Sequence, residues 1–257
     1  MLFPLSSSSQ SPVPNILPKS PVWLFDLDNT LHDASHAIFP AISANMNVYL
    51  ARVLATGGAT PTEAQIAAAR VGYWRKYGAT LLGMVRHHQV DPAHFLAETH
   101  ALGPAGSLAA MMRFETGLKR LLRRLPGRKI LLTNAPRRYS SDVLRELGLQ
   151  RHFDRHIAIE DMQVHGQLRP KPSKLMLRRL LRRHGLDARR CILVEDTLAN
   201  LRPAHQLGMR TAWVTQYLRT TDTSGTATLP RMLKRPAYVD VKVKSVRQLP
   251  GRLHRLR

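Results

Sequence analysis

The segment Val22-Trp23-Leu24-Phe25-Asp26-Leu27-Asp28-Asn29-Thr30 carries both an architectural and a chemical signal. Its leading apolar residues, Val22 to Phe25, predict a short buried strand, and two carboxylates at alternate positions follow that strand directly. In open parallel sheets, ligands bind at the carboxyl ends of the strands. Asp26 and Asp28 are therefore expected to turn into one cleft, one as a nucleophile and the other as a proton donor.

Further apolar runs alternate with helical patterns along the chain, which is typical of a parallel sheet covered by helices. We therefore predict an α/β fold, a Rossmann-like parallel-sheet core with an inserted helical cap domain. Glycines stand where three of the helices are expected to end. The expected strands span Lys129 to Leu132, Cys191 to Val194, Arg210 to Val214 and, more weakly, His156 to Ile159, and the helices span Arg137 to Leu147, Ser173 to His184 and Leu198 to Leu207.

The alternation stops between the first two strands, where the chain reads as helices without a convincing strand. An inserted helical domain is therefore expected there. Near the end of the chain, Ala237 to Asp240 is a candidate edge strand, and Lys244 to Leu249 a candidate last helix. The predicted domains are a disordered extension at 1–20, the core at 21–32 and 127–250, the helical cap at 33–126 and a basic tail at 251–257.

The chain is strongly basic, with 39 Lys and Arg against 17 Asp and Glu and a formal charge of +22. The basic residues are spread along the chain without a nucleic-acid-binding motif, which favours a generally basic surface over a dedicated nucleic-acid partner. No apolar run reaches the roughly 20 residues of a membrane-spanning helix, so no membrane partner is expected. The one cysteine, Cys191, lies among apolar neighbours and fits a buried thiol in a reducing cytoplasm.

Polar residues also follow the other predicted strands, as Thr133-Asn134 and Glu195-Asp196, and Lys171 lies on the loop before a helix. Taken singly, each could cap a helix or lie at the surface. Their recurrence at successive loops of one sheet edge favours a single site. The Thr133 hydroxyl, the Asn134 backbone amide and the Lys171 ammonium could hold phosphoryl oxygens as charge redistributes in a transition state.

A magnesium ion fits the same set of residues. Mg²⁺ prefers oxygen ligands and is usually held by a few carboxylates together with phosphate and water. Asp26, the backbone carbonyl of Asp28 and Asp196 could supply these oxygens. The ion would offset the repulsion between the Asp26 carboxylate and an incoming phosphate dianion.

This set of residues resembles the haloacid dehalogenase superfamily of phosphohydrolases. The resemblance implies that Asp26 attacks phosphorus, while Asp28 protonates the leaving group and then activates the water that cleaves the phosphoenzyme. A second Asp two residues after the nucleophile favours phosphatases over the dehalogenases, which lack it. Glu195 replaces the first of two commonly paired Asp residues, which leaves Asp196 as the direct metal ligand and Glu195 acting through water.

The helical insert lies where one subclass of the superfamily carries a cap that closes over small substrates. Its segment 73–83, YWRKYGATLLG, resembles the Tyr-x-x-x-Tyr-Gly signature of pyrimidine 5'-nucleotidases, and Arg169-Pro170-Lys171-Pro172 is also similar to that group. His32 departs from the group, which often has Tyr there. Tyr73 and Tyr77 share one helical face and either stack on a substrate base or pack the interior of the cap.

The sequence thus predicts a cytoplasmic, magnesium-dependent phosphatase for small phosphate monoesters, acting through an aspartyl-phosphate. The resemblance of the cap favours a pyrimidine 5'-nucleotidase, with UMP or CMP as the phosphorylated partner. A sugar-phosphate or phosphoglycolate phosphatase of the same superfamily is the alternative within the enzyme class. A basic nucleic-acid-binding protein on a phosphatase fold is the alternative from another class, although such a protein would have no chemical need for Asp26 and Asp28.

Overall fold

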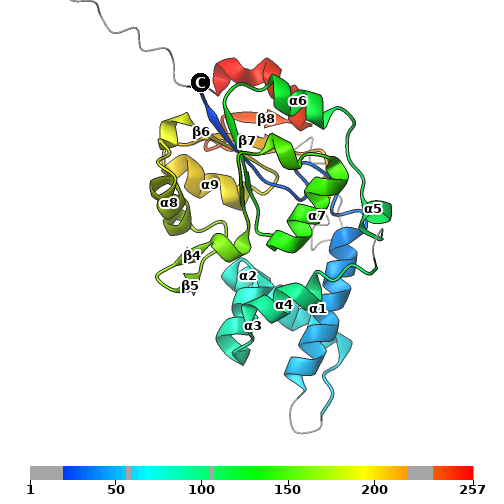
Figure 1. The fold of residues 1–257 in the computed structure, drawn as a ribbon. Coiled ribbons are helices and arrows are strands. Elements are labelled where there is room, and N and C mark those ends of the chain that lie inside the picture. Colours follow the sequence, from blue (N-terminus) through cyan, green and yellow to red (C-terminus); the bar gives the residue numbers. More distant parts are fainter. Residues whose placement is uncertain (1–19, 56–58, 105–106, 219–233, 257) are drawn as a thin grey trace, which may run out of the picture.

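A six-stranded parallel sheet forms the centre of the chain (Figure 1). The computed structural model describes residues 20–55, 59–104, 107–218 and 234–256, so nearly all of the extension expected at 1–20 lies outside the described residues. The strand order is β3-β2-β1-β6-β7-β8, with every neighbouring pair parallel. The strands are β1 (Val22–Phe25), β2 (Arg128–Leu132), β3 (Arg155–Ile157), β6 (Cys191–Glu195), β7 (Arg210–Val214) and β8 (Val241–Val243).

Helices cover both faces of this sheet, because each buried strand points alternate side chains to opposite faces. Trp23 and Phe25 belong to one apolar cluster, with α6 (Leu118–Arg124) and α7 (Arg137–Leu147). Val22 and Leu24 belong to the other, with α8 (Lys174–Arg183) and α9 (Leu198–Gln206). This doubly wound arrangement confirms the predicted Rossmann-like class. An antiparallel hairpin of β4 (Gln163–Val164) and β5 (Gln167–Leu168) extends toward the helices of the insert.

The helical insert between β1 and β2 contains α1 (Ile38–Leu54), α2 (Glu63–Tyr77), α3 (Thr80–His88), α4 (Pro92–Thr99) and α5 (Ser107–Met111). Its own apolar cluster includes Leu50, Met84 and Phe95, and the core contributes Ile159 to it. Helix α1 joins both parts, since Ile38 and Ile42 pack in the core instead. Helix α6, which falls within the range expected for the cap, has its apolar residues in the core cluster.

Local chemistry explains where the helices begin and end. Thr62 and Gln65 form a reciprocal capping box at the start of α2, and Ser173 caps α8 through its hydroxyl. Gly148 ends α7 at φ 64°, a left-handed conformation that glycine adopts without a steric penalty. Short 3₁₀ helices span Gln150–His152, Ile159–Asp161, Ala188–Arg190, Val246–Gln248 and Pro250–Arg255. No helix within the described ranges is both long and apolar enough to cross a membrane.

The end of the chain differs from expectation. The edge strand starts at Val241, not at Ala237, because the Asp240 carboxylate accepts a hydrogen bond from the backbone amide of Thr211 (2.8 Å) and ties the preceding turn to β7. The expected helix from Lys244 to Leu249 is a single 3₁₀ turn. The segment expected as a basic tail follows the start of a 3₁₀ helix, Pro250–Arg255, and the side chain of Leu256 is buried in the core cluster.

Candidate active site

The candidate site lies at the carboxyl end of β1, where the order in which the chain adds strands to the sheet reverses. The chain runs outward from β1 to β2 and β3 on one side, and later through β6, β7 and β8 on the other. Such a switch point leaves a crevice outside the strand ends. Asp26 follows β1, Thr133 follows β2, and Glu195 ends β6, so parallel register brings these residues to one edge. The Asp26 amide continues the ladder by donating to the Val194 carbonyl (2.9 Å).

The turn after β1 folds back on the strand end. Asn29 has φ 58°, a left-handed conformation that Asn tolerates better than most residues, and its side-chain amide exchanges two hydrogen bonds with Ser35. The turn returns the Thr30 hydroxyl to Asp26 Oδ2 (3.0 Å). Asp26 is thereby fixed at one oxygen by its own loop.

Lys171 lies between two buried carboxylates. Its Nζ donates to Asp26 Oδ1 and to Glu195 Oε2, both at 2.7 Å, and its side chain is 2% exposed. Although burial opposes the charged form, these two carboxylates raise the pKa of Lys171 above its ordinary value. The lysine is therefore a permanent ammonium at the centre of the site.

Asn134 holds the backbone of that lysine. Its Oδ1 accepts from the Lys171 amide (2.9 Å) and its Nδ2 donates to the Lys171 carbonyl (3.0 Å). Neighbouring Thr133 is 1% exposed and accepts from the Ala135 amide at its hydroxyl oxygen (3.1 Å). The structure thus brings Thr133, Asn134 and Lys171 to the strand ends beside Asp26, and it gives the Asn134 side chain a supporting contact that sequence reasoning missed.

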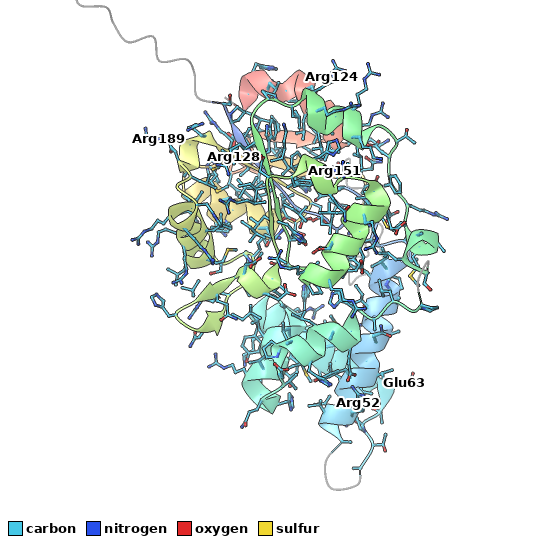
Figure 2. All side chains as sticks on the ribbon, in the orientation of Figure 1. Arg52, Glu63, Arg124, Arg128, Arg151 and Arg189 are labelled. Atoms are coloured by element: carbon cyan, nitrogen blue, oxygen red, sulfur yellow. The ribbon has the colours of Figure 1, made fainter. Side chains whose placement is uncertain are left out.

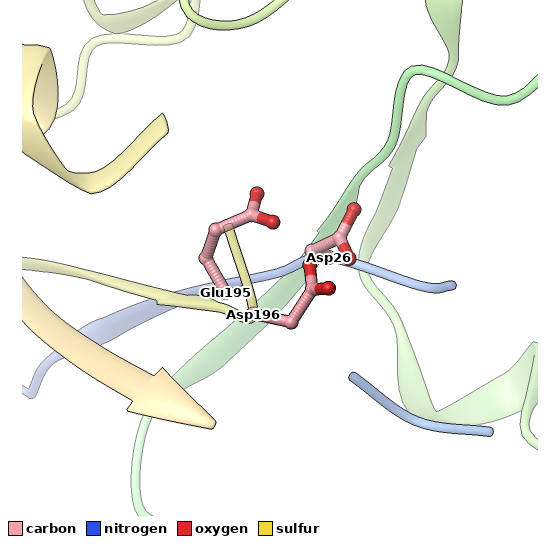
Figure 3. Close-up of side chains that lie close together, drawn as sticks. All are labelled: Asp26, Glu195 and Asp196. Atoms are coloured by element: carbon pink, nitrogen blue, oxygen red, sulfur yellow. The ribbon is translucent and has the colours of Figure 1, made fainter. Parts of the chain in front are cut away.

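Three carboxylates converge in the site, as Figure 3 shows. Asp26, Glu195 and Asp196 are all buried, and each offers an oxygen within 4.8 Å of the others. Burial, together with the charge of Glu195, raises the pKa of Asp26 from 3.8 to about 7. Burial and the charges of Glu195 and Asp26 likewise raise the pKa of Asp196 well above its ordinary value.

These carboxylates fit a divalent cation. They are hard oxygen donors, they repel one another, and the single ammonium of Lys171 leaves the cluster with net negative charge. Both Glu195 oxygens already accept hydrogen bonds, from Lys171 Nζ (2.7 Å) and from the Thr197 amide (3.2 Å). The Asp196 carboxylate accepts from the Thr197 hydroxyl at Oδ1 (3.1 Å) and makes no contact with the Lys171 ammonium, so it keeps more capacity to bind a metal than Glu195 does.

Asp28 lies apart from this cluster and is partly exposed, at 15% of its side chain. Its Oδ1 accepts from the Tyr139 hydroxyl at 2.7 Å and lies 2.8 Å from His32 Nε2. Burial and the charge of Asp28 raise the pKa of Tyr139 well above its ordinary value, so the phenol stays protonated and donates. The contact with Tyr139 was not predicted because Tyr139 is 111 residues away along the chain, and the contact with His32, four residues away, was not predicted either.

Tyr73 and Tyr77 lie on α2 and pack against α3 of the insert. The Tyr73 hydroxyl is 2.7 Å from His88 Nε2, and the Tyr77 hydroxyl is 2.6 Å from His87 Nε2. A Cβ added to Gly83 would lie 2.2 Å from Tyr73 Cγ, so the ring rests directly on the α3 backbone. In the described part of the chain, no hydrogen bond or ring contact joins either tyrosine to the carboxylates.

The sequence profile of the haloacid dehalogenase-like hydrolases matches residues 22–208, which include the β1 carboxylates, Lys171 and Asp196. The chain belongs to the haloacid dehalogenase-like hydrolases. The match spans the helical insert as well as most of the core. The resemblance stated from the motifs alone is thereby confirmed at the level of the family, and the chain is a hydrolase of this superfamily.

Solved structures of haloacid dehalogenase-like hydrolases share the fold. A phosphatase from Thermococcus onnurineus has a TM-score of 0.57 and 16% identity, covering 91% of this chain and 97% of its own. A hydrolase from Bacillus subtilis solved with magnesium has a TM-score of 0.55 and 18% identity, covering 91% and 99%. An L-2-haloacid dehalogenase from Xanthobacter autotrophicus, with chloropropionic acid covalently bound, has a TM-score of 0.55 and 15% identity, covering 91% and 98%. At these identities the likeness establishes the fold alone.

Proposed function

We propose that this hydrolase is a phosphatase that cleaves small phosphate monoesters through an aspartyl-phosphate on Asp26, with Asp28 as its general acid and base. The observation that carries the proposal is the pair of carboxylates at the end of β1 with different surroundings. Asp26 is buried against an ammonium, whereas Asp28 is partly exposed and held by the Tyr139 hydroxyl and the His32 ring. A nucleophile and a proton carrier need such a division of environment.

The reaction has two steps that share these residues. A carboxylate oxygen of Asp26 forms a bond to phosphorus as the ester P–O bond breaks, and the departing oxygen takes a proton from Asp28. Water then gives a proton to Asp28 while its oxygen bonds to phosphorus, and the bond between Asp26 and phosphorus breaks. Inorganic phosphate and the original carboxylate result.

Mg²⁺ would be held by Asp26, the backbone carbonyl of Asp28 and Asp196, with Glu195 acting through water. When bound, it would offset the negative charge of the incoming phosphate and polarise the phosphoryl oxygens. Its fit rests on the three buried carboxylates, since burial, together with the charge of Glu195, raises the pKa of Asp26 to about 7 without a cation.

The phosphate oxygens would be bound by Lys171, the Thr133 hydroxyl and the Asn134 backbone amide. Asn134 supports this arrangement by fixing the Lys171 backbone through two hydrogen bonds. A dianionic phosphoryl group would draw Lys171 Nζ away from one of its carboxylate partners. The phosphoryl group would then be stabilised by a charge-assisted hydrogen bond from Lys171 in place of its water shell.

Activity of variants tests the chemistry. Asp26→Asn should abolish turnover of p-nitrophenyl phosphate in a folded protein, because an amide cannot accept the phosphoryl group. Asp28→Asn should be severely impaired and should accumulate phosphoenzyme, which denaturing mass spectrometry can detect. A folded Asp26→Asn protein with wild-type turnover would remove the covalent mechanism.

For the substrate, we propose a pyrimidine nucleoside monophosphate recognised through Tyr73 or Tyr77. The support is the resemblance of segment 73–83 to pyrimidine 5'-nucleotidases and the position of α2, since a Cβ on Gly78 at its end would lie 3.6 Å from Pro172, next to Lys171. A panel of UMP, CMP, sugar phosphates and phosphoglycolate decides this, with kcat/KM highest for the pyrimidine nucleotides. Tyr77→Phe keeps the ring as a matched control for Tyr77→Ala.

A second candidate function, binding of single-stranded nucleic acid, is favoured by the outer face of α8. Its exposed arginines form no ion pair with any described residue, and α8 itself contains no acidic side chain. Two hollows of about 320 and 500 Å³ share Arg179 and Arg183 in their walls, and the carboxylate that lines the smaller one, Asp161, is paired with Arg137. These exposed arginines are Arg178, Arg179, Arg182 and Arg183.

Basic side chains also surround the end of the core opposite the insert, as the labelled Arg124, Arg128, Arg151 and Arg189 show in Figure 2, so general attraction must be separated from a site. Fluorescence anisotropy with a labelled 12-nucleotide RNA would do so. Replacing Arg179 and Arg183 with Gln should weaken binding at least 10-fold and lower its salt dependence, whereas the same change in two exposed α6 arginines should not. Equal losses of affinity in the α8 and α6 variants would show that binding depends only on the net charge of the protein. The α6 control changes Arg120 and Arg123.

A further inference from the structure

Two buried side chains hold the same oxygen of Asp28. Tyr139 comes from α7, on the helical layer, and His32 comes from the turn that follows β1. Their contacts with Oδ1 are 2.7 and 2.8 Å long, and the two side chains are 4% and 0% exposed. Asp28 Oδ2 accepts no hydrogen bond from any described residue. One oxygen of this carboxylate is thus fixed, and the other is left open.

The hydrogen bonding of His32 fixes its tautomer. Nδ1 is buried and has no partner among the described groups, whereas Nε2 faces Asp28 Oδ1. A proton on Nδ1 would be a buried donor without an acceptor, while Nε2 would face the carboxylate with a lone pair. A ring with its proton on Nε2 and none on Nδ1 avoids both costs. His32 therefore donates to Asp28, as Tyr139 does.

The Tyr139 ring is itself held from the insert. His100, the residue that ends α4, lies with its ring centroid 5.5 Å from that of Tyr139. The His100 ring is placed by contacts of its Nδ1 with the Leu96 carbonyl (3.1 Å) and the Thr99 hydroxyl (3.0 Å). Contacts from the core and from the insert thus set the position of the Tyr139 hydroxyl.

We propose that Tyr139 and His32 are positioning residues that clamp Asp28 by Oδ1 and present Oδ2 for proton transfer. The inference rests on the proposed phosphatase function. An aspartate carboxylate rotates broadly about its last torsion, so a lone Asp28 would spend part of its time turned away from the reacting oxygens. Two donors on one oxygen select a single orientation, and misplacement of a reacting group by about 1 Å can cost about 100-fold in rate.

The leaving group provides a readout that a purely structural role would not move. An alkoxide is strongly basic and needs the proton of Asp28, whereas p-nitrophenolate is weakly basic and departs without it. Tyr139→Phe removes only the hydroxyl. It should lower kcat/KM for alkyl phosphates roughly 10-fold, and for p-nitrophenyl phosphate less than about 3-fold, with KM almost unchanged.

Ser140→Ala is the matched control on the same helix. Ser140 is fully buried and bonds to the Pro136 carbonyl (2.8 Å) and to His156 (2.7 Å), not to Asp28. The Ser140→Ala variant should keep the wild-type ratio of kcat/KM for alkyl phosphates to kcat/KM for p-nitrophenyl phosphate. For His32, Gln retains an N–H donor and should restore activity lost in His32→Ala. If the buried alanine variant does not fold, Tyr139→Phe still decides the proposal.

Three results would overturn the inference: unchanged kinetics in Tyr139→Phe, an equal loss for both substrate types, or the same selective loss in Ser140→Ala. Asp28→Asn, measured alongside, separates this failure from failure of the proposed function. If the Asp28→Asn variant is severely impaired while the Tyr139→Phe variant has the kinetics of the wild-type protein, only the clamp is refuted. An active Asp28→Asn, or a wild-type protein that hydrolyses no phosphate monoester, refutes the phosphatase itself.

Discussion

Replacing Lys171 with methionine should destabilise the metal-free protein by about 3 to 5 kcal/mol at pH 8, which is the usual cost of removing one partner from a buried ion pair. The Nζ atom makes two charge-assisted hydrogen bonds of 2.7 Å to Asp26 and Glu195. These three side chains are 2%, 8% and 1% exposed, so water cannot replace the lost ammonium. Bonds of this type contribute about 1.5 to 3 kcal/mol each, which agrees with that range.

The loss should depend on pH in a defined direction. With Lys171 present, the pKa of Asp26 is already raised from 3.8 to about 7, and the ammonium acts to lower it. Without the ammonium, the pKa of the carboxyl groups in the folded protein rises further above their pKa in the unfolded chain. Stability of the variant therefore falls as pH rises from about 4 through 7, and the deficit relative to wild type is larger at pH 8 than at pH 5.5.

Urea unfolding followed by circular dichroism, with a chelator present, measures the effect. For a denaturant slope of about 3 kcal/mol per molar, the midpoint should fall by 1 M or more. Lys174→Met, an exposed lysine on the same segment, is the control and should change stability by less than about 0.5 kcal/mol. Glu195→Gln added to Lys171→Met should recover part of the loss. A Lys171→Met protein within 1 kcal/mol of wild type at pH 8 would refute the reasoning.

Three further outcomes are expected. Asp196→Ala should weaken magnesium binding at least 10-fold by calorimetry, and unchanged affinity would remove Asp196 from the metal site. Because burial raises the pKa of Cys191 to about 12, Ellman's reagent should leave the native thiol unmodified at pH 8 and label it in urea, so rapid native labelling would contradict its burial. Gly83→Ala, whose Cβ would meet Tyr73 Cγ at 2.2 Å, should destabilise by about 1 to 3 kcal/mol in thermal unfolding, whereas Gly72→Ala, with nothing within 4 Å, should be neutral or stabilising.

The strands that carry the chemistry were predictable because their signals are local. Val22–Phe25 and Arg210–Val214 match the predicted ranges, and β6 extends the prediction by one residue, Glu195. A buried strand of a parallel sheet reads as a continuous apolar run whatever surrounds it. Strand β8 was placed too early, because its start depends on a side-chain contact of Asp240 with β7 that no local pattern encodes.

The motifs that carry the resemblance to the superfamily are local too: the carboxylates directly follow or end strands whose ends face the same edge of the sheet, and Lys171 lies on the loop before α8. What surrounds each group was not encoded in this way. The buried position of Lys171 between two carboxylates, and the contacts of Tyr139 and His32 with Asp28, depend on packing among distant segments. Burial strengthens the interactions between charged groups because it removes water from around them. Which groups are removed from water is fixed only when the chain folds.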